Sequence, residues 1–223
     1  MAVLYEDNHI IIVNKHSSDL VQGDGTGDEP LDDIVRSYIK EKYNKQGDVF
    51  LGVVHRLDRP VSGCVVYART SKALTRLSEL FRTREVKKTY WAIVSDRPPA
   101  EEGNLSHWLK KNEAQNKSYV YATEVKGSKL AELSYRVLAR SEKYYLVEVD
   151  LRTGRHHQIR AQLAAAGCPI KGDLKYGSKR SNQGGGISLH SRRISFVHPV
   201  KNEEIKIEAP LPDDRVWKLF SEI

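Results

Sequence analysis

The chain has 223 residues, of which 39% are hydrophobic and 29% charged, and its formal net charge is +7. This composition is typical of a globular protein and excludes intrinsic disorder, and the length suffices to bury a core without disulfides or metals, so we expect a single domain over residues 1–223. No apolar run approaches the roughly 18 residues of a membrane span, and we expect no secretory signal, because the N-terminus lacks a basic patch followed by an apolar stretch.

Apolar periodicity predicts alternating strands and helices in the first half of the chain. Strands are expected near residues 9–14, 51–54 and 63–69. A loop is expected over 23–30, rich in Gly and Asp, and its glycine spacing does not match a dinucleotide-binding fingerprint. A helix should follow Pro30, with Ile34, Val35, Tyr38 and Ile39 on one face. A second helix should begin after Thr70 or Ser71 as N-cap and run to about Phe81.

Strands dominate the second half. They are predicted near residues 88–95, 117–123, 131–139 and 143–151. A short helix is expected from about Gly154 to Ala166, followed by turns, further strands and a terminal helix. The fold class is therefore α+β, with a mixed, mainly antiparallel sheet and flanking helices.

Charge is distributed unevenly along the chain. Residues 1–50 hold ten acidic and five basic residues, so the other 173 residues carry a net charge of +12. Basic residues gather over 76–90 and 171–193, and the first of these segments leads into Tyr90-Trp91. Such a pattern favours an extended polyanion such as a nucleic acid as partner, because neutralisation of phosphates and release of counterions drive non-specific binding. A solvated basic surface would account for the charge equally well.

Two polar segments could carry chemistry. In His55-Arg56-Leu57-Asp58-Arg59-Pro60-Val61-Ser62-Gly63, Asp58 lies between two arginines and could act as an ionised nucleophile or base, or simply bond its own turn. The segment Leu151 to Arg160, LRTGRHHQIR, joins a strand to a helix, where anions bind readily. There His156 and Arg160 are expected to face the same way, four residues apart.

Other chemistries fit poorly. The two cysteines have no pairing pattern, which indicates a reducing, cytoplasmic compartment. No zinc-ligand spacing, no His-Glu-x-x-His helix and no Gly-x-Ser-x-Gly motif occurs in the sequence.

At HRLDRPVSG the sequence resembles the RluA family of RNA pseudouridine synthases, whose motif is His-Arg-Leu-Asp-x-x-Thr-Ser-Gly. Three further segments are similar to family segments in the same order. These are VKKTYWAIV at 86–94, LRTGRHHQIRAQLAAAGCPIKGDLKYG at 151–177 and LHSRRISFVHPV at 189–200. The resemblance covers nearly the whole chain. The chain departs from the family pattern at two places. The early family motif Asn-Lys-Pro-x-Gly appears here as Asn14-Lys15-His16-Ser17-Ser18, without the Pro and the Gly, and Val61 replaces the usual Thr.

The resemblance implies isomerisation of specific uridines in structured ribosomal or transfer RNA, without metal or organic cofactor. Asp58 would be the nucleophile, attacking either the ribose or the base. Arg160 would pair with Asp58, Tyr90 would stack on the target base and Ile159 would form an apolar wall of the uracil pocket. Arg56 would enter the space left by a flipped nucleotide. The other expected substrate-binding residues are His55, Lys87, Lys88 and Arg155.

We further expect a cytoplasmic monomer without the N-terminal RNA-binding domain that many relatives carry. Substrate specificity would then arise from loops such as 97–118 and 178–188. There are two alternatives to this function. One is a non-catalytic RNA-binding or RNA-remodelling protein on this fold, and the intact Asp58, Tyr90 and Arg160 argue against it because pure binding needs no nucleophile. The other is a hydrolase, which would also use a carboxylate but would release free uracil.

Overall fold

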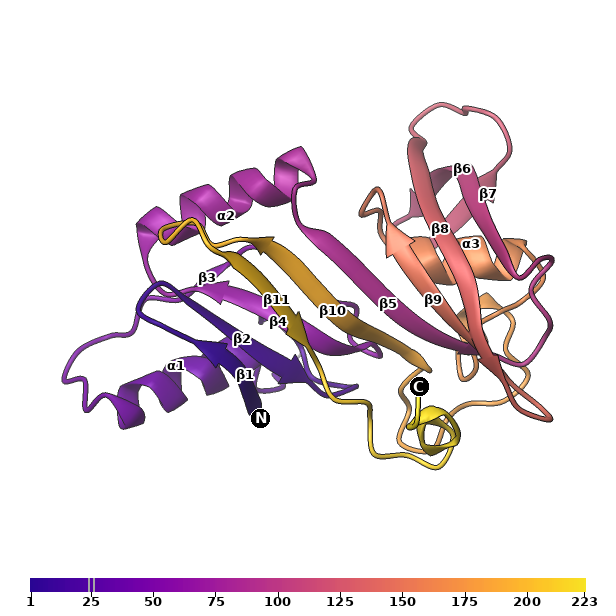
Figure 1. Ribbon diagram of the computed structural model, residues 1–223. Helices are drawn as coiled ribbons and strands as arrows, with labels where there is room; N and C mark the ends of the chain where they lie inside the picture. The colour runs from indigo at the N-terminus through magenta and orange to yellow at the C-terminus, as the bar shows by residue number, and fades with distance from the viewer. Residues whose placement is uncertain (24, 26) are drawn as a thin grey trace. The chain divides into compact units, whose positions relative to one another are not determined.

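The computed structural model describes residues 1–223 except Asp24 and Thr26, and the chain forms two compact units. The first unit comprises residues 1–87 and 191–210, and the second comprises 88–190 and 211–223. Each unit is built on antiparallel strands, and Figure 1 colours both along the chain. Among the described residues, no helix is long and apolar enough to cross a bilayer.

The first unit is a sheet flanked by two helices (Figure 1). Its strands are β1 (Ala2–Glu6), β2 (Ile10–Lys15), β3 (Gly52–Val53), β4 (Ser62–Ala68), β10 (Leu189–Val197) and β11 (Glu204–Glu208). Their order is β1-β2-β4-β10, with β11 paired to β10 and β3 to β4. The helices are α1 (Leu31–Lys42) and α2 (Ser71–Thr83).

Local sequence accounts for these elements. Four consecutive apolar residues of β2, Ile10 to Val13, are fully buried, as expected for a β-branched run. Of the two predicted N-cap candidates of α2, Thr70 and Ser71, Thr70 caps the helix: its hydroxyl accepts a hydrogen bond from the Ala73 N–H at 3.2 Å. The helix runs two residues past Phe81 to Thr83, and the C-cap residue that follows, Arg84, is left-handed with φ +65°.

The second unit is a five-stranded antiparallel sheet with one α-helix. Its strands are β5 (Lys87–Val94), β6 (Glu102–Asn112), β7 (Lys117–Tyr121), β8 (Lys129–Arg140) and β9 (Tyr145–Leu151), in the order β5-β9-β8-β6-β7. The helix α3 (Gln158–Ala165) packs on β6 and β7. Two short 3₁₀ helices are η1 (Leu174–Tyr176) and η2 (Trp217–Phe220).

The predicted α+β class is confirmed, and one predicted loop is corrected. Residues 97–118, expected to form a loop, contain the eleven residues of β6. Polar residues such as Asn104 and Lys110 alternate with buried or half-buried ones, so the segment lacks the apolar run that marks β2. Pairing with β8 and β7 on both sides makes it a strand. Segment 178–188 has no helix or strand, and Asp24 and Thr26 of the expected 23–30 loop lie outside the described residues.

Candidate active site

Asp58 lies half-buried in the loop between β3 and β4 of the first unit. Its neighbour Leu57 is buried and anchors the loop. The Asp58 carbonyl accepts a hydrogen bond from the Val61 N–H at 3.0 Å, which closes a turn around Arg59-Pro60. The backbone on both sides of the carboxylate is therefore held in place.

A buried ammonium group reinforces this loop. The Lys15 side chain at the end of β2 is fully buried, and its Nζ donates to the carbonyls of His16 at 2.9 Å, Arg59 at 2.9 Å and Val61 at 2.6 Å. Burial lowers the pKa of Lys15 to about 8, while the carboxylate of Asp58 is among the charges that raise it. At neutral pH the Lys15 amine is still mostly protonated, and each of the three N–H bonds of the ammonium can donate to one of the three carbonyls.

Gly63 and His55 join the same loop to β4. A Cβ on Gly63 would lie 2.6 Å from the Ser191 backbone N, and its φ is +113°, so glycine is required where β4 and β10 approach closely. The His55 Nε2 accepts the Val66 N–H at 2.9 Å, and its ring stacks on Phe81 with 4.7 Å between centroids. These contacts give His55 a structural role, and its predicted role in binding substrate stays a prediction.

The segment LRTGRHHQIR forms a braced loop in the second unit. The Thr153 hydroxyl donates to the Gln158 side-chain oxygen at 2.7 Å and accepts from the Glu132 N–H of β8 at 2.9 Å. The same Gln158 oxygen accepts the Arg155 N–H at 3.0 Å. The buried side chains of Thr153 and Gln158 therefore hydrogen-bond to each other and to backbone N–H groups, which fixes the shape of the loop.

The predicted helix start at Gly154 is wrong, because α3 begins at Gln158. His157 precedes it with φ +53°, a left-handed conformation that interrupts the helix. His156 therefore lies outside the helix, and the expected helical relation between His156 and Arg160 does not hold. The His156 ring instead stacks on His157, with 3.8 Å between centroids.

Arg160 on α3 forms a buried ion pair with Asp173. Its Nε lies 2.7 Å from Oδ2 and its Nη2 2.9 Å from Oδ1, while the side chains are 6% and 1% exposed. This bidentate arrangement is the strongest geometry open to a guanidinium and a carboxylate. It uses two of the five N–H donors of Arg160. The sequence reasoning assigned no role to Asp173.

Tyr176 and His157 support this pair. The Tyr176 ring lies 5.1 Å from the Arg160 guanidinium, and its hydroxyl accepts the Ser118 N–H at 2.8 Å. The same hydroxyl lies within hydrogen-bond distance of His157 Nδ1, 3.0 Å away. Burial, followed by the nearby charge of Arg160, lowers the pKa of His157 to about 2, so the imidazole stays neutral.

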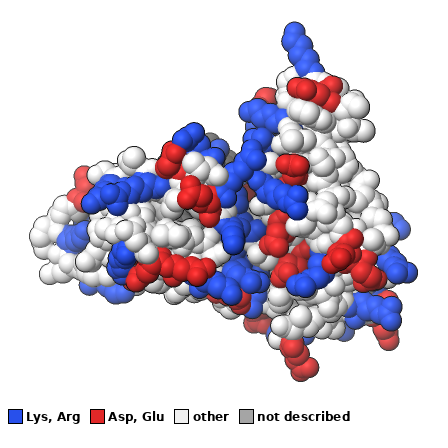
Figure 2. Space-filling model, turned by 45° about the horizontal axis from the view of Figure 1, so that its top comes forward, with Lys and Arg blue, Asp and Glu red and all other residues white. Residues whose placement is uncertain are grey.

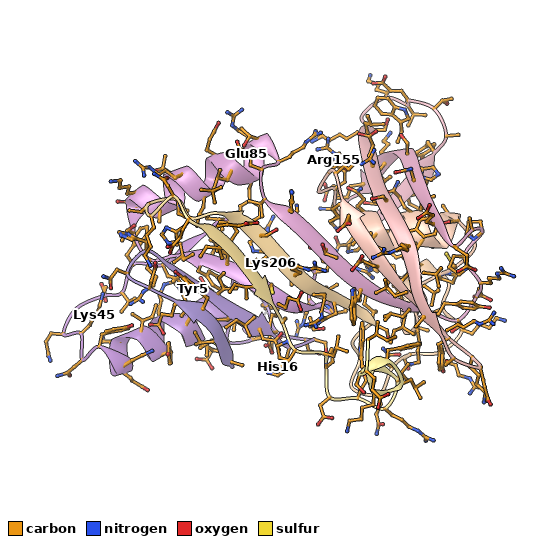
Figure 3. The ribbon with its side chains drawn as sticks, viewed as in Figure 1. Tyr5, His16, Lys45, Glu85, Arg155 and Lys206 are labelled. Carbon is orange, nitrogen blue, oxygen red and sulfur yellow. The ribbon has the colours of Figure 1, made fainter. Side chains whose placement is uncertain are left out.

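The remaining predicted residues differ in exposure. Tyr90 on β5 and Ile159 on α3 are buried, at 7% and 4% exposed. Lys88 is half-buried, and burial lowers its pKa; a Cβ on Gly154 would lie 3.4 Å from its Nζ. Arg155, labelled in Figure 3, extends from the loop after β9, and its Nε donates to the Leu130 carbonyl at 2.9 Å.

Two predicted residues, Arg56 and Lys87, are exposed. On the face shown in Figure 2, Lys and Arg side chains form several groups interspersed with acidic ones. A mixed surface of this kind provides several places where phosphates could be bound.

The predicted site residues are divided between the units. Asp58, Arg56, His55 and Lys87 belong to the first unit. The others belong to the second: Lys88, Tyr90, Arg155, Ile159 and Arg160. The pairing of Arg160 with Asp58 stays a prediction. Lys15 and Asp173 were not predicted as site residues, although both lie in segments that correspond to family motifs. A lysine at the end of an apolar strand was the sequence signal that could have identified Lys15.

Comparisons with known proteins agree with the motifs. The pattern of the family described as RNA pseudouridylate synthase matches residues 9–165. The chain is 34% identical over 221 residues to ribosomal large subunit pseudouridine synthase C of Buchnera aphidicola, covering 95% of this chain and 68% of that protein. It is 30% identical to tRNA pseudouridine synthase C of Vibrio cholerae, covering 100% of this chain and 95% of the relative.

A solved structure shares the fold. It is that of human RNA pseudouridylate synthase domain containing 4, with a TM-score of 0.83 and 24% identity, covering 99% of this chain and 92% of that one. Because the sequence match extends over most of the chain, the protein belongs to the RluA-type family of RNA pseudouridine synthases, isomerases that convert uridine in RNA to pseudouridine.

Proposed function

We propose that this protein isomerises specific uridines in ribosomal or transfer RNA with Asp58 as nucleophile, and that the two units together form one catalytic domain. The Asp58 loop is the observation that carries the proposal. Its carboxylate is half-buried, and Lys15 and Gly63 hold the backbone around it. The buried Lys15 ammonium fixes the backbone of the loop and thereby the position of the Asp58 carboxylate. Catalysis by positioning requires a nucleophile that is fixed in this way.

The reaction loses no atoms. Attack by the Asp58 carboxylate forms a covalent bond to the ribose or to the base, and the glycosidic bond between ribose and nitrogen breaks with its electron pair going to the nitrogen. The uracil rotates and bonds to the ribose through carbon, and the bond to Asp58 breaks, which regenerates the carboxylate. The proton on that carbon is removed while the freed nitrogen gains one. A hydrolase would instead add water and release uracil.

Arg160 keeps the nucleophile ionised and oriented. Its pairing with Asp58 is the one that the family resemblance implies, and the bidentate bond to Asp173 is consistent with it, because that bond holds the guanidinium in a fixed orientation. Asp173 and Tyr176 would then act as positioning residues, because they fix the plane from which the guanidinium donates.

The other predicted residues bind the substrate. Tyr90 stacks on the target base and Ile159 forms an apolar wall, consistent with their burial. Arg56 is exposed and fills the space of the extruded nucleotide. Extrusion costs a few kcal/mol, less for an unpaired base, so we propose a stem-loop substrate. Lys87, Lys88 and Arg155 contact phosphates.

The names of relatives support the substrate class: one is a ribosomal large subunit pseudouridine synthase and another is a tRNA pseudouridine synthase. We place the enzyme in the cytoplasm as a monomer. The free thiols of Cys64 and Cys168, both buried, are consistent with a reducing compartment.

The test compares wild type with Asp58→Ala and Asp58→Asn on unmodified ribosomal and transfer RNA of the source cell. Pseudouridine is mapped by carbodiimide labelling and reverse-transcription stops. We expect a discrete stop with wild type, none with either variant, and RNA affinity within about threefold of wild type. An active Asp58→Ala protein would refute the nucleophile, and release of free uracil would refute isomerisation.

A further inference from the structure

The β6–β7 hairpin of the second unit has two different faces. Leu109 and Ser118 are buried, and Val120 packs with Leu109 on the side of α3. The alternate residues, paired across the strands as Trp108 with Tyr121, Lys110 with Tyr119 and Asn112 with Lys117, point the other way. We call these six residues the hairpin face.

The hairpin face combines exposed aromatic rings with ammonium groups. Tyr119 and Tyr121 are 40% and 37% exposed, and Lys110 is exposed. The half-buried Lys117 lies between this face and the side of α3: its Nζ is 5.6 Å from the centre of the Tyr119 ring and 5.2 Å from that of the Tyr176 ring. The Tyr119 hydroxyl donates to the side chain of Gln115 in the turn, which orients the ring. Tyrosine and lysine are common on edge strands for structural reasons alone. What indicates a ligand is therefore how these residues are spaced along the strand, and not their presence.

That pattern matches the chemistry of single-stranded RNA. Bases stack on exposed aromatic rings and phosphates pair with lysines. Residues two apart on a strand lie about 6.7 Å from each other, which is two base-stacking steps of about 3.4 Å. Tyr119 and Tyr121 therefore have the spacing of a sequence-tolerant stacking ladder. The next pair beyond Trp108 is Ser106 with Glu132, whose carboxylate would repel phosphate and so bounds the face.

We propose that the hairpin face docks an unpaired segment of the RNA substrate, with bases stacked on Tyr119 and Tyr121 and phosphates held by Lys110 and Lys117. This inference rests on the proposed function only in taking RNA as substrate. It assigns RNA contacts to an edge strand that contributes none of the predicted site residues. The occupant is RNA because the face carries two lysines and no acidic residue.

The experiment measures binding of a fluorescein-labelled single-stranded RNA of about 12 nucleotides, a typical site size, by fluorescence anisotropy. An RNA of equal length with abasic sugars serves as the second probe, since it keeps the phosphates and lacks the bases. The variants are Tyr119→Leu with Tyr121→Leu, the ring-preserving Tyr119→Phe with Tyr121→Phe, and Lys110→Gln with Lys117→Gln. The matched charge control is Lys126→Gln with Lys143→Gln, which changes two exposed lysines in turns of the same unit.

We expect the Leu pair to weaken binding of the base-containing RNA roughly tenfold or more, with little effect on the abasic probe, because stacking is lost. The Phe pair should bind like wild type. The Lys110/Lys117 pair should weaken both probes and lower the slope of log K against log salt by about 0.7 per lysine, whereas the Lys126/Lys143 control should do neither. An unchanged thermal melting curve shows that each variant is folded.

Two results would overturn the inference: wild-type affinity of the Leu pair for the base-containing RNA, or equal losses on both probes. Binding is measured without turnover, so it is independent of Asp58. Loss of activity in Asp58→Ala with an intact stacking effect would support both proposals, and an active Asp58→Ala protein would refute only the proposed function.

Discussion

Asp173 shows how a buried partner can determine the behaviour of a predicted functional residue. Its carboxylate is 1% exposed and neutralises the Arg160 guanidinium inside the second unit. Removing one member of a buried ion pair leaves an uncompensated charge. Positioning and stability are therefore coupled at this residue.

We predict that Asp173→Asn lowers the free energy of unfolding by about 3–5 kcal/mol, because the buried Arg160 guanidinium loses its bidentate carboxylate partner within the second unit. Urea unfolding measures this loss, and pseudouridine formation should fall with it. The matched control is Asp213→Asn, which removes an ion pair with Lys218 that is exposed on both sides and should leave the urea midpoint unchanged. Equal midpoints for Asp173→Asn and wild type would contradict the prediction.

Lys15 links protonation to the shape of the Asp58 loop. Its pKa of about 8 is set first by burial, which lowers it, while Asp19 and Asp58 raise it and Arg59 lowers it. A neutral amine has two N–H donors, so deprotonation leaves one of three carbonyls without its bond. The loop around Asp58 then loses a restraint.

We predict that activity falls above pH 8 while the fold persists. The unfolded lysine has a pKa of about 10.4, so between the two values the unfolded state binds more protons. This group's contribution to the free energy of unfolding therefore rises with pH. The ¹³C resonance of one lysine Cε should titrate near pH 8 and disappear in Lys15→Met, whereas Lys40→Met, on the exposed side of α1, should retain it. The prediction would be contradicted if the Lys15 Cε resonance titrated at the same pH as those of the surface lysines.

At the scale of elements, glycine allows β4 and β10 to approach closely at the end of the Asp58 loop. The backbone of Gly63 is left-handed, and a side chain there would meet the Ser191 backbone. Neither the strain nor the clash can be relieved by a side-chain rotation, because the contacting atoms are backbone. This accounts physically for the glycine that ends HRLDRPVSG.

We predict that Gly63→Ala lowers the melting temperature by several degrees or prevents folding, since one kcal/mol corresponds to roughly 2–4 °C in a chain of this size. Gly47→Ala is the control, because a Cβ there meets nothing within 4 Å and its φ is not in the left-handed region. That variant should be neutral or slightly stabilising. Similar melting temperatures for the two variants would show that β10 can move away from β4.

Across the whole molecule, positive charge is concentrated after residue 50. Lys87 is exposed and Lys88 half-buried at the start of β5, where the first unit meets the second along the chain. Long-range attraction of RNA depends on the total charge, whereas each phosphate contact adds to the salt dependence of binding.

We predict that Lys87→Gln with Lys88→Gln weakens RNA binding and lowers the slope of log K against log salt by about 0.7 per lost contact for single-stranded RNA. Binding is titrated between low and high salt for both proteins. The Lys126/Lys143 variant has the same net charge and should keep the wild-type slope. If the two variants behave alike, net charge rather than contact by Lys87 and Lys88 explains the binding.

Local periodicity, capping residues and short motifs sufficed to predict the α+β class, most strands, a helix cap at Thr70 or Ser71 and the family. Tertiary structure alone decided that residues 102–112 form a strand, since an alternating segment is stabilised by its partners β7 and β8. It also decided that α3 begins after a left-handed His157, that Asp173 pairs with Arg160 and that Lys15 holds the Asp58 loop. Asp173 is 13 residues from Arg160, and Arg59 is 44 residues from Lys15. Contacts between residues so far apart in the sequence depend on packing rather than on a local pattern.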